Sequence, residues 1–132
     1  MSVFLDTSAL FAVFDADDQE HGRAAKAWRS LSDREEDLVT TNYVLVETFA
    51  LFQNRLGLEA VRALQQNFVP LLRILWIGEE NHEAAVTALL TAGRKKLSLV
   101  DCVSFEVMRR SGLTRAFAFD RHFAEQGFQQ IP

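Results

Sequence analysis

The beginning of the chain contains the feature that most constrains its fold. Residues Val3–Leu5 form an apolar run without polar alternation, which is typical of a strand buried on both faces of a parallel sheet. Asp6 ends this run, and Thr7 and Ser8 after it are good N-cap residues. We therefore expect a helix from about Ala9, with Asp6 at the carboxyl end of a central strand, the edge where open α/β sheets bind ligands. The alternative is that Asp6 only caps the helix.

Strand and helix patterns alternate along the rest of the chain. Four further strands are predicted, at residues 38–41, 72–77, 116–119 and 128–131. Six further helices are predicted. One has Asp17 or Asp18 as its cap and runs to about Leu31, a second has Asn42 as its cap and runs to Leu56, and four lie at residues 58–68, 79–92, 98–111 and 121–126. This order predicts an α/β fold, a three-layer α/β/α sandwich with a central, mostly parallel sheet of four to five strands. We expect a single domain over residues 1–132.

Composition excludes several classes of protein. The formal net charge of -4 argues against a general polyanion binder, although clustered basic side chains can still bind nucleic acid. No apolar run approaches the roughly 18 residues that span a bilayer. The start of the chain has no basic segment of a signal peptide, and Cys102 is the only cysteine. We expect a cytoplasmic protein with no membrane partner.

Four carboxylates are expected in buried surroundings without cationic partners. Asp6 and Asp120 each follow a predicted strand, whereas Glu47 and Asp101 interrupt apolar segments of helices. A buried carboxylate without a partner is costly, so something must compensate its charge. Several such acids in one chain indicate hard divalent cations, which prefer oxygen ligands.

Each acid also has a purely structural interpretation. Ser98 and Asp101 fit the pattern of a capping box. Glu47 can form a buried hydrogen bond with a Thr or Tyr, and Asp120 can cap the last short helix. These interpretations are weaker together than singly, because both strand-end acids would have to point away from the same edge of the sheet.

Other residue types give weaker signals. The histidines share no metal-ligand spacing and are expected to have ordinary surface or helix roles: His21, His82 and His122. A core position is expected for the single cysteine and for three aromatic residues: Cys102, Trp28, Trp76 and Tyr43. Phosphate contacts are expected from among the basic residues of the second half, each of which can otherwise be a solvated surface residue: Arg94, Lys95, Lys96, Arg109, Arg110, Arg115 and Arg121.

Four short segments around the acids occur in a recognisable order over essentially the whole chain: Val3–Leu10, Val44–Glu47, Leu97–Asp101 and Phe119–Phe123. In this order they resemble the PIN-domain ribonucleases, particularly the VapC-type toxins of bacteria. The resemblance implies a metal-dependent endoribonuclease that holds Mg²⁺ or Mn²⁺ between four carboxylates, those of Asp6, Glu47, Asp101 and Asp120. It also implies a supporting hydroxyl from Thr7 or Ser8, an RNA substrate, a homodimer and a small antitoxin that covers the site.

Rival functions fit the sequence less well. An aspartyl-phosphate phosphatase usually needs a second Asp two residues after the first, where this chain has Ser8. A receiver domain would have its phosphoacceptor on a middle strand, whereas Asp6 comes too early and Asp120 too late. A degenerate RNA-binding module would not need the acids. The sequence leaves open whether a nuclease of this kind would act as a toxin or in housekeeping RNA processing.

Overall fold

The computed structural model describes all 132 residues and contains one five-stranded sheet in which every pair of neighbouring strands is parallel. In chain order the strands are β1 (Ser2–Leu5), β2 (Asp37–Thr41), β3 (Arg73–Leu75), β4 (Arg115–Phe117) and β5 (Gln129–Ile131). In space their order is β3-β2-β1-β4-β5. The order reverses between β1 and β4, which is where the carboxyl ends of parallel strands leave room for a ligand.

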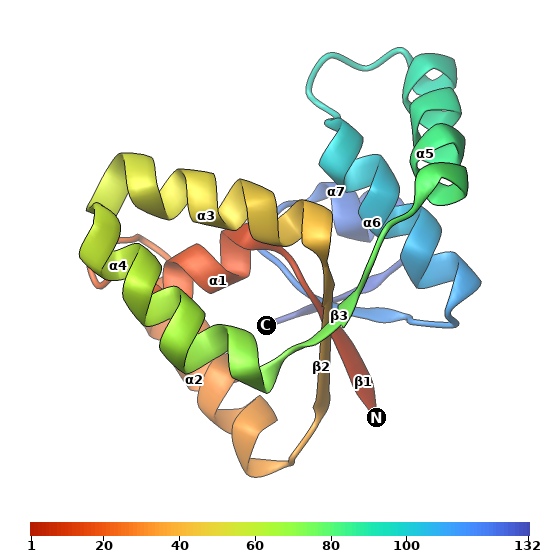
Figure 1. Ribbon diagram of the computed structural model, residues 1–132. Helices are drawn as coiled ribbons and strands as arrows, with labels where there is room; N and C mark the ends of the chain where they lie inside the picture. The colour runs from red at the N-terminus through yellow and green to blue at the C-terminus, as the bar shows by residue number, and fades with distance from the viewer.

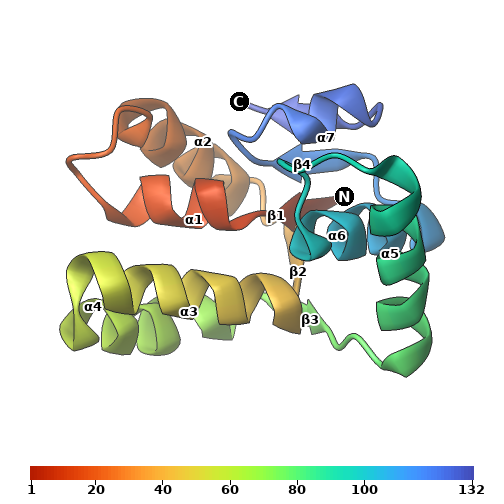
Figure 2. The ribbon, with the colours of Figure 1, turned by 90° about the horizontal axis from the view of Figure 1, so that it is seen from above.

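Helices cover both faces of this sheet, as the three-layer prediction required. They are α1 (Thr7–Phe14), α2 (His21–Asp33), α3 (Asn42–Leu56), α4 (Leu58–Ala63), α5 (Glu79–Ala92), α6 (Leu99–Arg110) and α7 (His122–Glu125). Helices α1 to α4 lie on one side of the sheet and α5 and α6 on the other (Figures 1 and 2). None of these helices combines the length and the apolar character that crossing a bilayer would require.

The alternation of side chains along β1 explains the two main cores. Val3 and Leu5 are fully buried in a cluster with residues of α1 and α2, whereas Phe4 is fully buried in a cluster with residues of α6. Side chains of a strand alternate between its faces, so this strand joins both layers. The prediction of a central strand buried on both faces is confirmed.

Two helices are capped by a residue that lies one or two positions before the residue expected to cap them. Asp6, and not the hydroxyl residues after it, is the N-cap of α1, and its side chain accepts a hydrogen bond from the amide of Ser8. Thr41 likewise caps α3 in place of Asn42. The Asn42 side chain instead accepts a hydrogen bond from the Ile77 amide at 2.7 Å, and β3 ends before Ile77, at Leu75.

Other predicted elements differ in their boundaries. The helix expected over 58–68 stops at Ala63 and continues as a π-helical turn and a 3₁₀ turn before β3. β4 ends at Phe117, because the amide of Phe119 donates to the Ser8 hydroxyl at 3.0 Å and not to a neighbouring strand. Helix α2 begins at His21 without a side-chain cap, so neither acid proposed for that role caps it. The core position expected for Trp76 is wrong, because its surface is 74% exposed.

Candidate active site

The four predicted carboxylates lie together at the carboxyl edge of the sheet. Asp6, Glu47, Asp101 and Asp120 line one cavity of about 360 Å³. They come from the end of β1, from α3, from the first turn of α6 and from the loop after β4. Both predicted supporting residues, Thr7 and Ser8, line the same cavity. The sheet therefore gathers side chains that are separated by more than a hundred positions in the sequence.

Asp6 has a structural role and still presents an oxygen to the cavity. Its Oδ2 atom accepts hydrogen bonds from the Ser8 amide at 3.2 Å and from the Ser8 hydroxyl at 2.6 Å, whereas its Oδ1 atom has no hydrogen-bond partner. Burial, together with the charges of Asp101 and Glu47, raises the pKa of Asp6 to about 7 against the lowering effect of these two hydrogen bonds. Asp6 therefore caps α1, as the structural interpretation predicted, and keeps one carboxylate oxygen free of hydrogen bonds from the protein.

Asp101 combines the same two roles. It forms the predicted capping box with Ser98, in which the Ser98 amide donates to Asp101 Oδ2 at 3.2 Å and the Asp101 amide donates to the Ser98 hydroxyl at 3.0 Å. Burial raises the pKa of Asp101, and the nearby charge of Asp120 contributes to the rise. The Oδ2 atom of Asp101 thus takes part in the capping box of α6, whereas its Oδ1 atom accepts no hydrogen bond from the protein.

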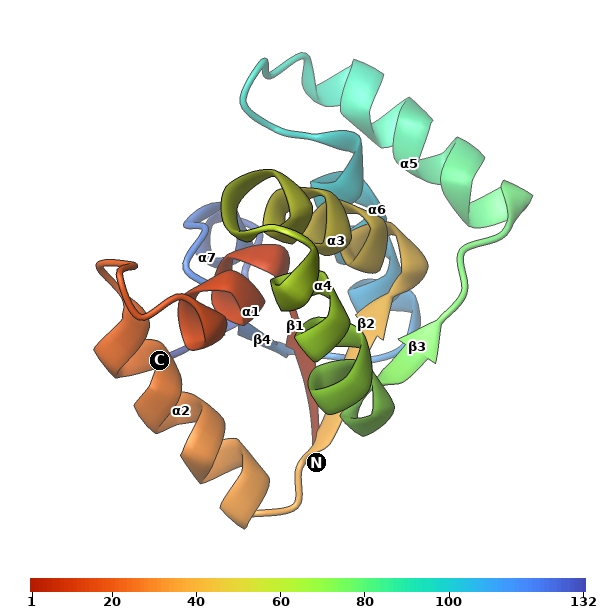
Figure 3. The same cartoon turned by 60° about the vertical axis from the view of Figure 1, so that its left-hand side comes forward.

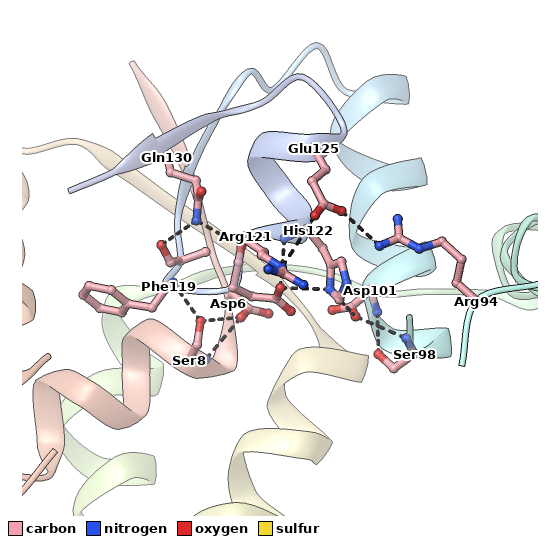
Figure 4. A network of polar contacts seen from close by, with 12 residues as sticks. Asp6, Ser8, Arg94, Ser98, Asp101, Phe119, Arg121, His122, Glu125 and Gln130 are labelled. Atoms are coloured by element: carbon pink, nitrogen blue, oxygen red, sulfur yellow. Dashed lines mark hydrogen bonds and ion pairs between the residues drawn. The ribbon is translucent and has the colours of Figure 1, made fainter. Parts of the chain in front are cut away.

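The two hydroxyl residues after Asp6 have different functions. The Ser8 hydroxyl donates to Asp6 and accepts from the amide of Phe119, so it connects the end of β1 with the loop after β4 (Figure 4). The Thr7 hydroxyl lies 2.9 Å from the hydroxyl of Thr48 on α3, and it joins α1 to the helix that carries Glu47. Ser8 is therefore the direct support of the first carboxylate, a choice that the sequence left open.

Glu47 is the one acid of the four whose carboxylate accepts no hydrogen bond from a backbone amide. Its side chain is half-buried on α3, where burial raises its pKa, the Thr7 hydroxyl partly offsets that rise, and the charges of Asp101 and Asp120 add to it. The apolar run around Glu47 therefore does not hide a structural ion pair. Its carboxylate faces other carboxylates.

His122 belongs to the site, so the ordinary role expected for it is wrong. The backbone amide of His122 donates a hydrogen bond to Asp120 Oδ1 at 2.9 Å. Its buried Nδ1 atom lies 2.9 Å from Asp120 Oδ1 and 3.9 Å from Asp101 Oδ2, yet makes no hydrogen bond. The available signal was the spacing of Asp120 and His122, because an Asp at a helix start commonly accepts from the amide two residues later.

The side chains present fit a divalent metal ion. No Lys or Arg forms an ion pair with any of the four carboxylates, and His122 is the only potentially cationic side chain within 4.0 Å of one of them. Ligand atoms of Asp101, Asp120 and His122 lie within 4.8 Å of one another. Carboxylate oxygens are the ligands that Mg²⁺ and Mn²⁺ prefer, and the hydrogen-bond-free ring nitrogen of His122 is a donor that Mn²⁺ also accepts.

The predicted phosphate contacts divide into three groups. Arg94 and Arg121 lie beside the acids and share one partner, Glu125, at 3.1 and 3.6 Å (Figure 4). Lys95 and Lys96 are exposed on the loop before α6. The remaining arginines have other partners: Arg109 pairs with Gln126, Arg110 with Glu106, and Arg115 with Glu36. Arg115 starts β4 and so lies at the opposite edge of the sheet, away from the four carboxylates.

The chain is similar to known proteins over almost its whole length. A family model described as the PIN domain matches residues 3–129. The curated protein "23S rRNA-specific endonuclease VapC20" of Mycobacterium tuberculosis, recorded for strains CDC 1551 / Oshkosh and ATCC 25618 / H37Rv, is 34% identical over 130 residues, covering 98% of this chain and 97% of the relative.

Solved structures give the same fold. The crystal structure of Mycobacterium tuberculosis VapC20, described as a sarcin-ricin loop cleaving toxin, has a TM-score of 0.85 at 33% identity, with 96% of this chain and 95% of that chain covered. FitAcB from Neisseria gonorrhoeae has a TM-score of 0.71 at 19% identity, covering 100% of this chain and 97% of that one. DNA-bound VapBC from Salmonella typhimurium has a TM-score of 0.69 at 15% identity, covering 98% of this chain and 97% of that one. At these lower identities the likeness concerns the fold alone.

Proposed function

The chain belongs to the PIN domain family, and from this membership we propose that it is a metal-dependent endoribonuclease that hydrolyses phosphodiester bonds of RNA. The observation that carries the proposal is the gathering of four carboxylates in one cavity without a Lys or Arg partner. A stable protein does not collect uncompensated carboxylates without a ligand for them. We place the activity in a single domain, residues 1–132, in the cytoplasm.

The proposed metal ligands are Asp6, Glu47, Asp101 and Asp120, with Mg²⁺ or Mn²⁺ as the ion. The bound ion would lower the pKa of a water molecule and stabilise charge on the phosphate. The role of the chain is to present oxygens that are already oriented: Ser8 fixes Asp6, Ser98 fixes Asp101, and the amide of His122 fixes Asp120. Attack by water on the phosphorus gives a 5′-phosphate and a 3′-hydroxyl.

The rim of the cavity supplies positive charge for the RNA backbone. Arg94 and Arg121 are held beside the acids by Glu125, and Lys95 and Lys96 lie nearby in sequence on an exposed loop. Phosphate contacts of this kind position a nucleic acid without reading its sequence. We propose that these four residues orient the phosphate over the carboxylates.

The similarity to VapC20 suggests the first substrate to test. That relative is described as specific for 23S rRNA, and the solved structure as cleaving the sarcin-ricin loop. We propose that this chain is likewise a toxin that cuts structured RNA, and a sarcin-ricin loop oligonucleotide is the first candidate. A housekeeping RNA-processing role is the alternative, and no feature of the site favours it.

We also propose a small antitoxin and a homodimer. An apolar groove of about 620 Å³ runs beside α3, and its lining includes Val46 and Trp76, which are 70% and 74% exposed. Such a surface suits a second protein chain, and an antitoxin arginine could pair with the carboxylates. Sedimentation of the parent and of Trp76→Ala at micromolar concentration tests the dimer. A parent that sediments only as a monomer would contradict it.

Cleavage assays test the proposed activity. The protein is incubated with structured RNAs in Mg²⁺, in Mn²⁺ and in EDTA, and the ends of the products are identified by mass spectrometry. We expect cleavage with either metal and none in EDTA. Asp33→Asn is the matched control for Asp6→Asn, because Asp33 is exposed and forms no ion pair. Cleavage that persists in EDTA would contradict the metal mechanism.

A further inference from the structure

A second cavity, of about 490 Å³, lies between α2 and the C-terminal strand β5 and takes no part in the proposed chemistry. The C-terminus lies beside α2 in all three ribbon views (Figures 1 to 3). Four of its ten lining residues are basic, namely Arg23, Lys26, Arg34 and Arg115, and none is acidic. In a chain with a net charge of -4, such a concentration of positive charge is a local exception.

The basic residues form a line along α2. Arg23, Lys26, Ser30 and Arg34 line the cavity at spacings of three and four residues, so they follow one face of the helix. From the first to the last of them the helix rises about 16 Å, at 1.5 Å per residue. That length accommodates several phosphates of one nucleic acid strand.

Two of these cations are free. Arg23 pairs with Glu20 at 2.7 Å, and Arg115 pairs with Glu36 at 3.3 Å. Lys26 and Arg34 are exposed and form no ion pair with any carboxylate. The pair of free cations is thus available to an anionic ligand, and the hydroxyl of Ser30 lies between them on the same helix face.

The line of charge begins beside the acidic cavity. The Arg23 guanidinium lies over the Phe119 ring, 5.6 Å from its centroid. Phe119 immediately precedes Asp120, and its amide is hydrogen-bonded to Ser8. At the other end, Arg115 starts β4 at the far edge of the sheet. The basic cleft therefore leads from the carboxylates to the opposite edge of the molecule.

We propose that the cleft between α2 and β5 is a phosphate-binding track for the RNA strand that extends away from the cleaved bond, an inference that rests on the proposed function. Lys26 and Arg34 are its free contacts, and Ser30 offers a neutral hydrogen bond between them. The acidic cavity repels RNA until metal is bound, so attraction must come from elsewhere on the surface. The track contacts the backbone and does not read bases.

The test measures RNA binding as a function of salt. Fluorescence anisotropy of a labelled structured RNA is recorded in the Asp6→Asn background with Mg²⁺, between about 50 and 200 mM salt. The test variant is Lys26→Ala/Arg34→Ala. Its matched control is Arg55→Ala/Arg62→Ala, which removes the same charge from exposed positions of α3 and α4 outside the cavity.

We expect the test variant to bind RNA about tenfold more weakly and the slope of log affinity against log salt to fall by about 1 to 2, since each lost phosphate contact removes about 0.7 to 0.9. The control should keep both the affinity and the slope of its parent. In the otherwise unchanged protein, Lys26→Ala/Arg34→Ala should raise KM for a long structured RNA and leave kcat unchanged. Equal melting temperatures exclude a folding defect.

Three results would overturn the proposal, and they are distinguishable. If the parent cleaves RNA but the test variant keeps the affinity and salt slope of the control, the track is wrong while the nuclease stands. If the variant loses binding of polyglutamate but not of RNA, the cleft serves an acidic protein. If the parent neither binds nor cleaves RNA, the proposed function fails and the track with it.

Discussion

The two edges of the sheet handle carboxylates in opposite ways. At the amino edge, Asp37 accepts from Arg73 at 2.7 Å, and Glu36 pairs with Arg115 and with the chain's N-terminus at 3.3 Å each. Hydrogen bonds to Arg73 and Ser2 lower the pKa of Asp37. At the carboxyl edge no arginine or lysine pairs with the acids, and burial raises the pKa of Asp6, Glu47 and Asp101.

This contrast separates carboxylates that have an arginine partner from carboxylates that have no arginine or lysine partner. The residue types are the same at both edges, so type alone does not decide the role. Partners decide it, because a paired carboxylate gains from being charged whereas a buried, unpaired one resists charging. The following predictions test the contrast, beginning with the largest expected effect.

Removing one charge at the carboxyl edge should abolish activity. Asp6→Asn should lower kcat/KM for RNA cleavage by at least about 100-fold, the cost typical of losing one preorganised group that acts on developing charge. Asp37→Asn, the matched change at the amino edge, should leave kcat/KM within about twofold, since its ion pair is exposed and structural. Steady-state cleavage of one labelled RNA measures both. Equal losses of kcat/KM in the two variants would contradict the predicted difference between the two edges of the sheet.

In EDTA the stability of the parent should decrease as pH rises. Folding raises the pKa of Asp6 from its ordinary value of 3.8 to about 7, so the folded state binds this proton more tightly than the unfolded state does. The contribution of Asp6 to the free energy of unfolding is therefore largest below pH 3.8, its unfolded-state pKa. This contribution falls as pH rises toward 7 and is lost above that pH. Asp6→Asn lacks this decline and should be more stable than the parent at pH 8 by about 1 to 3 kcal/mol.

Thermal melts of the parent and of Asp6→Asn at several pH values, with EDTA and with Mg²⁺, measure this difference. The Asn side chain can still accept from the Ser8 amide, so the cap of α1 should survive. Mg²⁺ should stabilise the parent by mass action and the variant less. A variant that melts far below the parent in EDTA, with an undiminished Mg²⁺ shift, would show that Asp6 is only a cap.

The support of Asp6 should have a smaller effect than Asp6 itself. Ser8→Ala removes the 2.6 Å hydrogen bond to Asp6 and leaves the Phe119 amide without its acceptor. We expect Mg²⁺ affinity to fall about tenfold, the lower end of what losing an outer partner of a metal ligand costs. Calorimetric Mg²⁺ titration measures it, with exposed Ser32→Ala as the control. Unchanged affinity in Ser8→Ala would return the supporting role to Thr7.

At the amino edge the expected effect is the smallest. Asp37→Asn should destabilise the protein by less than about 1 kcal/mol at pH 7, because the Asp37–Arg73 pair is exposed to solvent. The sign is opposite to that for Asp6. The pKa of Asp37 is lowered by folding, so its contribution is present at neutral pH and is lost as pH falls through that lowered value. Urea titrations at pH 7 and pH 3 compare the two.

Much of this fold follows from local patterns. The apolar run before Asp6 identified the central strand, and alternating strands and helices identified the parallel sheet, because both depend on short-range periodicity. The convergence of four acids could be expected, since strand ends of a parallel sheet share one edge. The missed parts depend on contacts distant in sequence. The Ile77 amide donates to the Asn42 side chain, so β3 ends earlier than predicted. The Phe119 amide likewise donates to the Ser8 hydroxyl, so β4 also ends earlier than predicted.

The position of His122 shows the same limit within the site. Its ring reaches Asp101 only because α6 and the loop after β4 meet in space, and no spacing of histidines reports that. The choice between Thr7 and Ser8 likewise depends on which hydroxyl faces α3 and which faces the loop after β4. Side chains of adjacent residues at a strand end differ in direction, and sequence does not record that direction.

The division of Asp6 between a capping oxygen and a free oxygen also affects how such a gene can change. An Asp codon becomes an Asn codon by a single G-to-A transition. Asn is as good a helix cap as Asp but a poor ligand for a hard cation. One base change at this codon is therefore expected to yield a full-length, folded protein that lacks one proposed metal ligand. On the proposed function, lineages in which the nuclease is harmful would have a short mutational route to silence it while they keep the rest of its surface.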